Sequence, residues 1–84
     1  MTFGEKVRRR RKAIDLTQEE LAKKIDVDLC KTTVSHWENG IAYPNVAHLL
    51  KLAIVLEMPL NYLFEEELYS IDPVASKQVS YRLL

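Results

Sequence analysis

The sequence has few of the residues that interrupt or cross-link regular structure. Among 84 residues there are two glycines, three prolines and one cysteine. So little Gly and Pro argues against a loop-rich sandwich or barrel and favours an all-α domain. The single cysteine, Cys30, excludes an internal disulfide and fits a reducing, cytoplasmic location.

Long apolar runs are also missing. The longest charge-free apolar stretch extends only from Leu52 to Leu56, whereas a membrane span needs roughly 20 residues. Lys6 and the run 8–12 near the N-terminus are not followed by an apolar segment, so a signal peptide is not expected here. With 48% apolar and 29% charged residues, the chain has the composition of one small folded domain without a membrane partner.

The chain also lacks net charge, since twelve basic residues balance twelve acidic ones. Taken alone, this disfavours nucleic acid as a partner. The distribution is uneven, however: residues 1–40 carry nine basic and seven acidic groups, and residues 41–84 carry three and five. Binding depends on the local field of one face, so the basic cluster at 6–12 can attract an anion. The alternative is that this cluster is a solvated helix face.

Apolar periodicity and capping residues predict five short helices. The pairs Thr2/Glu5 and Thr17/Glu20 have the spacing of capping boxes. The helices are expected at about 3–14, from Thr17 to Ile25, from near Leu29 to Asn39, at 46–57 after the cap Asn45, and from Pro59–Leu60 onward. Expected core positions include Val34 and Trp37, then Val46, Leu49, Leu50, Ala53 and Leu56, and finally Leu60, Leu63 and Phe64. The prediction is a compact five-helix bundle.

The end of the chain is less regular. Asp72–Pro73 has the form of an N-cap and first helical turn, so a sixth helix could end near Leu83. A frayed tail is the alternative. The predicted organisation is a domain at 1–67 and a tail at 68–84.

Three segments together resemble a known family. They are 17–22 (TQEELA), 34–40 (VSHWENG) and 49–53 (LLKLA), with Pro44 between the last two. In this order they are similar to the helix-turn-helix proteins of the phage repressor and Cro type, also called the xenobiotic response element family. The resemblance covers about 3–64, roughly three quarters of the chain. It implies a lambda-repressor-like fold whose third helix enters the DNA major groove.

The resemblance also implies which residues contact double-stranded DNA. The positions that read bases fall on Lys31, Thr32 and His36. The positions that contact phosphates fall on Thr17, Gln18, Thr33, Asn39 and Tyr43, with Arg11 nearby. Without the resemblance, the simplest interpretation of Lys31, His36 and Gln18 is that they are solvated surface residues.

Arg11 shares the inward side of its helix with Val7 and Ile14, where an unpaired charge is costly. The family often pairs this arginine with the glutamate that is Glu38 here. We therefore expect a partly buried Arg11–Glu38 ion pair between the first and third helices.

The sequence departs from the family pattern at three points. Asp26 and Asp15 replace frequent glycines, although aspartate tolerates the left-handed region better than most residues. The segment between Ile25 and Val34 is two residues longer than usual. Either the turn is longer, or the third helix begins early with Asp28 as its N-cap, and we favour the early start.

The expected function is a sequence-specific transcriptional regulator, most often a repressor, that binds a palindromic operator as a homodimer. The dimer candidates are Ile54, Leu68, Tyr69, Ile71 and Val74. Alternatives are an antitoxin-type autoregulator with a toxin partner, or a protein-interaction module. An enzyme is not expected, because Cys30 and His36 lie ~240° apart around one helix. Neither a metal nor a cofactor is expected.

Overall fold

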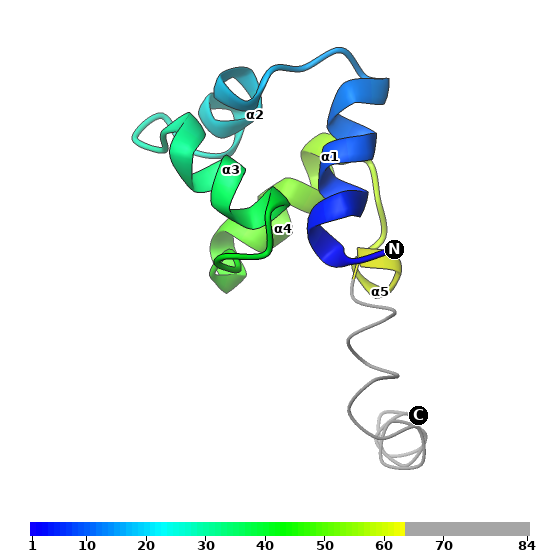
Figure 1. The fold of residues 1–84 in the computed structure, drawn as a ribbon. Helices are drawn as coiled ribbons and strands as arrows, with labels where there is room; N and C mark the ends of the chain where they lie inside the picture. The colour runs from blue at the N-terminus through cyan, green and yellow to red at the C-terminus, as the bar shows by residue number, and fades with distance from the viewer. Residues whose placement is uncertain (64–84) are drawn as a thin grey trace.

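The structure, a computed structural model, describes residues 1–63 and contains five α-helices there (Figure 1). They are α1 (Phe3–Ala13), α2 (Gln18–Ile25), α3 (Lys31–Glu38), α4 (Val46–Leu56) and α5 (Leu60–Leu63). The predicted all-α, five-helix, lambda-repressor-like fold is confirmed. No helix in this part of the chain is long and apolar enough to cross a membrane. The predicted sixth helix, the boundary at residue 67 and Phe64 lie outside the described residues.

Side-chain caps fix the starts of three helices. Thr2 and Thr17 accept from the backbone N–H groups of Glu5 and Glu20, and Asn45 accepts from that of His48. At α2 the box is complete, because Glu20 also accepts from the Thr17 backbone at 2.9 Å. These bonds satisfy N–H groups that have no partner inside a helix.

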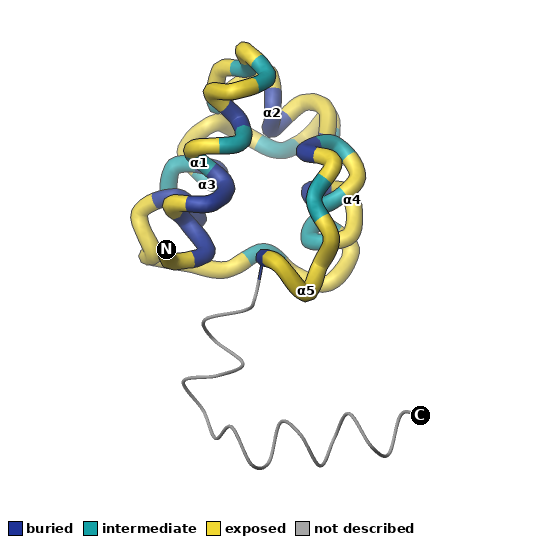
Figure 2. Tube along the Cα trace, turned by 90° about the vertical axis from the view of Figure 1, so that its right-hand side faces the viewer, coloured by how far each residue is buried: buried dark blue, intermediate teal, exposed yellow. Residues whose placement is uncertain are grey.

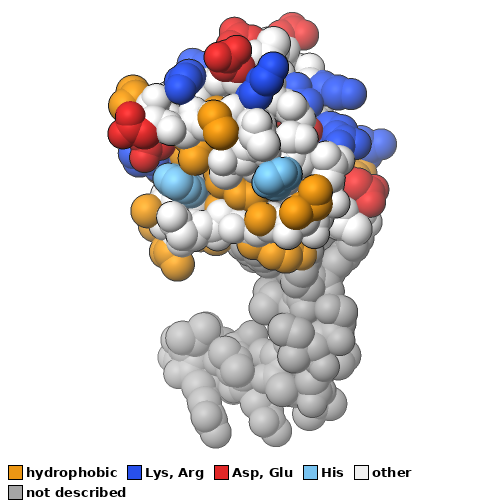
Figure 3. All heavy atoms as spheres, turned by 60° about the vertical axis from the view of Figure 1, so that its left-hand side comes forward, with side chains coloured by type: hydrophobic (Ala, Val, Ile, Leu, Met, Phe, Trp, Pro, Cys, Tyr) orange, Lys and Arg blue, Asp and Glu red, His pale blue; other side chains and the backbone are white. Residues whose placement is uncertain are grey.

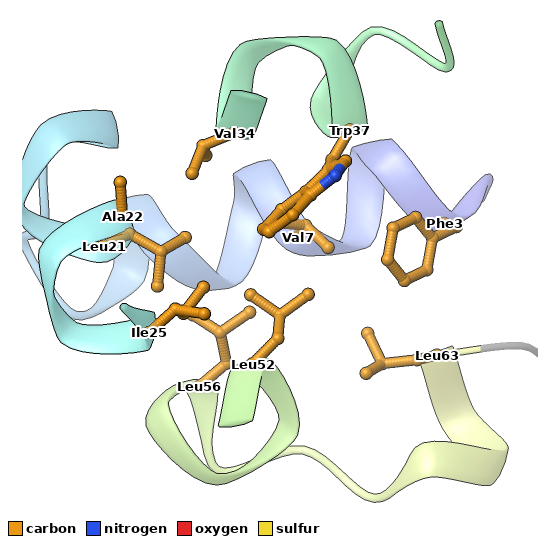
Figure 4. Packing of buried hydrophobic residues seen from close by; sticks show 10 residues of the cluster. All are labelled: Phe3, Val7, Leu21, Ala22, Ile25, Val34, Trp37, Leu52, Leu56 and Leu63. Atoms are coloured by element: carbon orange, nitrogen blue, oxygen red, sulfur yellow. The ribbon is translucent and has the colours of Figure 1, made fainter. Parts of the chain in front are cut away.

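The core draws on all five helices, whose buried side chains converge on the interior in Figure 4. Phe3 and Val7 come from α1, and Trp37 from α3 lies among them. The other buried apolar residues are Leu21, Ala22, Ile25, Val34, Leu52, Leu56 and Leu63. Figure 2 shows the buried positions turned toward the centre and the exposed ones toward the outside.

Two residues of α4 that were predicted to lie in the core are exposed instead. Val46 is 72% exposed and Leu50 is 47% exposed, whereas Leu52 and Leu56 are fully buried. The reason is that α4 is apolar on nearly every side, so its periodicity does not identify the inward face. Leu60 of α5 is also exposed, against the prediction.

The predicted early start of α3 was wrong as well. The N-cap is Cys30, not Asp28, and the two additional residues lengthen the turn instead. Asp26 closes this turn, because its carboxylate accepts from the Asp28 N–H and its carbonyl from the Leu29 N–H, both at 3.0 Å. The Lys23 ammonium donates to the carbonyls of Val27 and Leu29. The Asp28 N–H, the Leu29 N–H and the carbonyls of Val27 and Leu29 are therefore all hydrogen-bonded within the turn.

The two aspartates that replace glycines behave differently. Asp15 has a φ of 58° and takes the left-handed conformation after α1. Asp26 is extended, with a φ of −158°, so the turn after α2 needs no left-handed residue there.

Candidate nucleic-acid interface

Helices α2 and α3 pack against each other, and α1 packs against α3. Gly4 permits a close approach of α1 to the end of α3. A Cβ atom at this position would lie 2.3 Å from the Glu38 carbonyl oxygen and 2.6 Å from that of Trp37. Only a residue without a side chain fits there.

The outward side of α3 is polar. Val34 and Trp37 are buried, and Lys31 and Thr32 are exposed. Thr33, Ser35 and His36 are half-buried. The structure therefore places Lys31, Thr32 and His36 on accessible positions of the predicted reading helix. Figure 3 shows both histidine side chains on one face of the molecule, with lysine and arginine side chains above them.

The structure contains the predicted Arg11–Glu38 ion pair. Nε of Arg11 donates to Oε2 of Glu38 at 2.6 Å, and Nη2 donates to Oε1 at 3.1 Å. The third nitrogen of the guanidinium also has a partner, because Nη1 donates to the carbonyl of Leu16 at 2.8 Å. Only 10% of the Arg11 side chain is exposed and none of the Glu38 side chain.

Glu38 also accepts from two residues that the predicted pair did not include. Nε of Arg8 lies 3.3 Å from its Oε1, and Nε2 of Gln18 donates to the same oxygen at 3.2 Å. One carboxylate therefore joins α1, the start of α2 and the end of α3.

The surroundings of Glu38 keep it ionised. Burial, the largest single influence, would raise its pKa. Hydrogen bonds from Arg11 and Gln18, the Arg11 charge and the Arg8 hydrogen bond together outweigh burial, so the pKa is lowered. A charged Glu38 is what holds the three donors in place.

The predicted phosphate-contacting residues lie around this network. Gln18 begins α2 and is half-buried, with its amide nitrogen on Glu38. Asn39 is the C-cap of α3, and Tyr43 is 59% exposed with its ring centroid 5.4 Å from that of Phe3. Thr17 serves as the α2 cap and Thr33 is half-buried. Of the six predicted residues only Arg11 is buried.

The basic cluster at 6–12 separates into structural and exposed members. Lys6 is 4% exposed and donates to the Tyr62 carbonyl at 2.6 Å, and Arg10 donates to the Leu56 carbonyl at 2.8 Å. Arg9 and Lys12 are exposed. The cluster was predicted to be one source of positive field, because nothing in the charge run distinguishes these roles.

Arg8 was not among the predicted site residues. Its Nη2 donates to the side-chain oxygen of Asn39 at 2.7 Å. The spacing of Arg8 three residues before Arg11 places both on one side of α1, and this was the available signal.

Cys30 lies at the start of α3 and is exposed. Hydrogen bonds with the side chain and backbone of Thr33 lower the pKa of its thiol. Within residues 1–63, no group of three or more His, Cys, Asp or Glu side chains is arranged to hold a metal ion.

Five helices in this order, with α2 and α3 joined by a turn, define a helix-turn-helix protein. Residues 7–63 match the family model described as "Helix-turn-helix". The chain belongs to this family, as its resemblance to the phage repressor type predicted.

Two curated relatives and one solved structure are similar to this chain. The HTH-type transcriptional regulator DicA of Escherichia coli (strain K12) is 36% identical over 81 residues, 95% of this chain and 58% of DicA. The HTH-type transcriptional activator BcrR of Enterococcus faecalis is 35% identical over 67 residues, 80% of this chain and 32% of BcrR. The P22 c2 repressor, solved in complex with a synthetic operator, superimposes with a TM-score of 0.70 at 32% identity, covering 75% of this chain and 92% of that one. The chain thus spans little more than half of DicA and a third of BcrR.

Proposed function

We propose that this protein is a sequence-specific, double-stranded DNA-binding transcriptional regulator that reads the major groove with α3. The observation that carries the proposal is the polar outer side of α3, fixed from behind by the buried Trp37 and by the Arg11–Glu38 pair. The P22 c2 repressor, to which the fold is similar, was solved on an operator. DicA and BcrR are named as transcriptional regulators.

The dimensions of α3 suit this role. A helix about 10–12 Å across fits a major groove roughly 12 Å wide when its outward side chains are short and polar. Lys31 can donate to guanine O6 or N7, and the Thr32 methyl or hydroxyl group can contact a base edge. His36 can donate or accept.

Phosphate contacts would set the position of α3 on the duplex. Gln18 and Thr17 lie at the start of α2, where free N–H groups favour an anion. Asn39, Thr33 and Tyr43 supply further donors around α3. We assign Arg11 a structural role, because its guanidinium already serves Glu38 and Leu16.

A homodimer would place two copies of α3 on a palindromic operator, with half-sites about 34 Å apart. Ile54 is 74% exposed, and Leu50 and Val46 lie four and eight residues before it. These three residues, the α4 stripe, therefore follow one side of the helix. A stripe without charge can face its own copy across a two-fold axis without repulsion. The other dimer candidates, Leu68, Tyr69, Ile71 and Val74, lie outside the described residues.

We propose repression as the regulatory direction, because a protein bound in the major groove of an operator can block access to a promoter. The names of the similar proteins differ on this point, since they include a repressor and an activator. An antitoxin that regulates its own operon would use the same surface, and a protein-interaction module would not need it. The family membership of the chain agrees with a non-enzymatic role.

In vitro selection of bound DNA tests the proposal. We expect a palindromic consensus whose affinity falls steeply with salt, because bound phosphates release counterions. Lys31→Ala and His36→Ala should each relax the preference at one base position per half-site, at a cost of about 1–3 kcal/mol. Lys12→Ala, which removes an exposed lysine from α1, is the control and should leave the consensus unchanged. Failure to enrich any sequence would contradict the proposal and favour a protein partner.

A further inference from the structure

Arg8 connects the ion-pair network to the surface of α3. Its Nε lies 3.3 Å from Oε1 of the buried Glu38, and its Nη2 donates to Oδ1 of Asn39 at 2.7 Å. The side chain of Arg8 is 42% exposed. One guanidinium therefore spans from the interior to the outer end of α3.

This contact determines the orientation of the Asn39 amide. A guanidinium only donates, so the atom of Asn39 that faces it must be the oxygen. The amide nitrogen then points the other way, where it donates to the hydroxyl oxygen of Ser35 at 3.2 Å. The second N–H of Asn39 and the O–H of Ser35 remain to donate to another group.

We propose that Arg8 is a positioning residue for DNA binding: it orients Asn39 so that Asn39 and Ser35 donate together to one phosphate oxygen. The inference rests on the proposed function and extends it to two residues, Arg8 and Ser35, that family resemblance does not indicate. A relay of hydrogen bonds that starts at a cation also strengthens each donor along it.

Without Arg8, the Asn39 side chain is free to rotate by half a turn. Its oxygen would then face the phosphate in about half of the molecules and repel it. The contact through Ser35 would weaken at the same time, because the hydroxyl group would lose the donor that orients it. The expected loss corresponds to roughly one hydrogen bond, or about fivefold to tenfold in affinity.

A double-mutant cycle on the selected operator tests this relay. Arg8→Ala and Asn39→Ala should each weaken binding about fivefold to tenfold. Arg8→Ala made in the Asn39→Ala background should weaken it less than about twofold further, because the residue through which Arg8 acts is gone. A second cycle with Ser35→Ala should show the same non-additivity. Arg9→Ala, an exposed arginine on the neighbouring position of α1, should change affinity less than any of these.

Two further measurements separate the possible outcomes. Circular dichroism at the assay temperature should show that each variant is folded, since Arg8 also contacts Glu38. Additive effects, with the salt slope reduced by about 0.9, would mean that Arg8 contacts a phosphate directly and would overturn the proposal. If the wild-type protein binds no DNA, the proposed function fails and this inference fails with it. Additivity in a protein that does bind removes the inference alone.

Discussion

The guanidinium of Arg11 and the carboxylate of Glu38 meet side by side through two hydrogen bonds, 2.6 and 3.1 Å long. The arginine comes from the last turn of α1 and the glutamate is the last residue of α3. Such a bidentate pair fixes angle as well as distance. The orientation of the proposed reading helix therefore depends on a contact that faces the interior.

Arg11→Met should strongly destabilise the fold, because the buried carboxylate of Glu38 would lose the positive charge that offsets its cost of burial. Removing one partner of a buried pair typically costs about 3–5 kcal/mol. Urea unfolding followed by circular dichroism measures the loss. Arg9→Met is the matched control on the same helix and should change stability by no more than about 0.5 kcal/mol, as expected for an exposed site. Equal midpoints for the two variants would show that the pair contributes little.

Glu38 should make stability depend on pH at the acid end. Its pKa is lowered in the folded state, so the unfolded chain takes up the proton first as pH falls. The stabilisation is fully present above the ordinary value of 4.5 and is lost as pH drops through the folded pKa.

Comparison with Glu38→Gln isolates this effect. The difference in unfolding free energy between the wild type and the variant should be constant near neutral pH. It should shrink below about pH 4.5. Urea titrations at a series of pH values measure this, and a difference that grew on acidification would contradict the assignment.

Gly4→Ala should destabilise the protein although alanine is the better helix former. The new Cβ would meet backbone oxygens of α3 at 2.3 and 2.6 Å, which cannot move aside like the end of a side chain. We expect a net cost of about 1–3 kcal/mol, measured by thermal or urea unfolding. An unchanged stability would mean that α1 can shift away from α3 at no cost.

Gly40 provides a contrasting control. It has a φ of +74°, but an added Cβ atom would meet nothing within 4 Å, so Gly40→Ala should cost about 1–2 kcal/mol through backbone strain alone. Gly40→Asn should recover part of this loss, because asparagine tolerates the left-handed region. Gly4→Asn should recover nothing, because its side chain is larger.

Local chemistry made the helix order predictable from sequence. Thr17, Glu20 and Asn45 act within three residues of where they stand, so their spacing alone marks the helix starts. The Arg11–Glu38 pair could also be expected, because a charge on the inward side of α1 needs a partner and the family resemblance supplied one. Both inferences required little knowledge of the tertiary structure.

The remaining features depend on contacts that a sequence pattern does not encode. The inward face of α4 was predicted only in part. Leu56 is buried, and Leu49 and Ala53 pack against the core as predicted, but Val46 and Leu50 are exposed. Apolar residues occur on nearly every side of this helix, so packing decides which of them are buried. The start of α3 was misjudged because aspartate is a common N-cap residue, whereas Asp28 lies within the turn that Asp26 closes. The role of Arg8 requires Asn39 to lie beside it, 31 residues further along the chain.

The α4 stripe of Val46, Leu50 and Ile54 leads to a prediction about assembly on DNA. Leu50→Glu and Ile54→Glu change exposed positions, so they should leave the stability of the monomer within about 0.5 kcal/mol. If the stripe joins two copies, each variant brings a new carboxylate close to its own copy across the two-fold axis. The repulsion should weaken binding to a palindromic operator by about 5- to 150-fold, the usual range for coupling between two sites.

A single half-site separates this effect from damage to the reading surface, because one copy binds it without a partner. Affinity for the half-site should therefore match that of the wild type in both variants, while affinity for the palindrome falls. Lys51→Glu places a glutamate beside the stripe, on an exposed position of α4. It changes the net charge more than the stripe variants do, so it controls for general repulsion from DNA. If Lys51→Glu reduced palindrome binding as much as Leu50→Glu, the loss would come from charge rather than from the stripe. If both stripe variants lost half-site binding equally, α4 would contribute to DNA contact and the dimer surface would lie elsewhere.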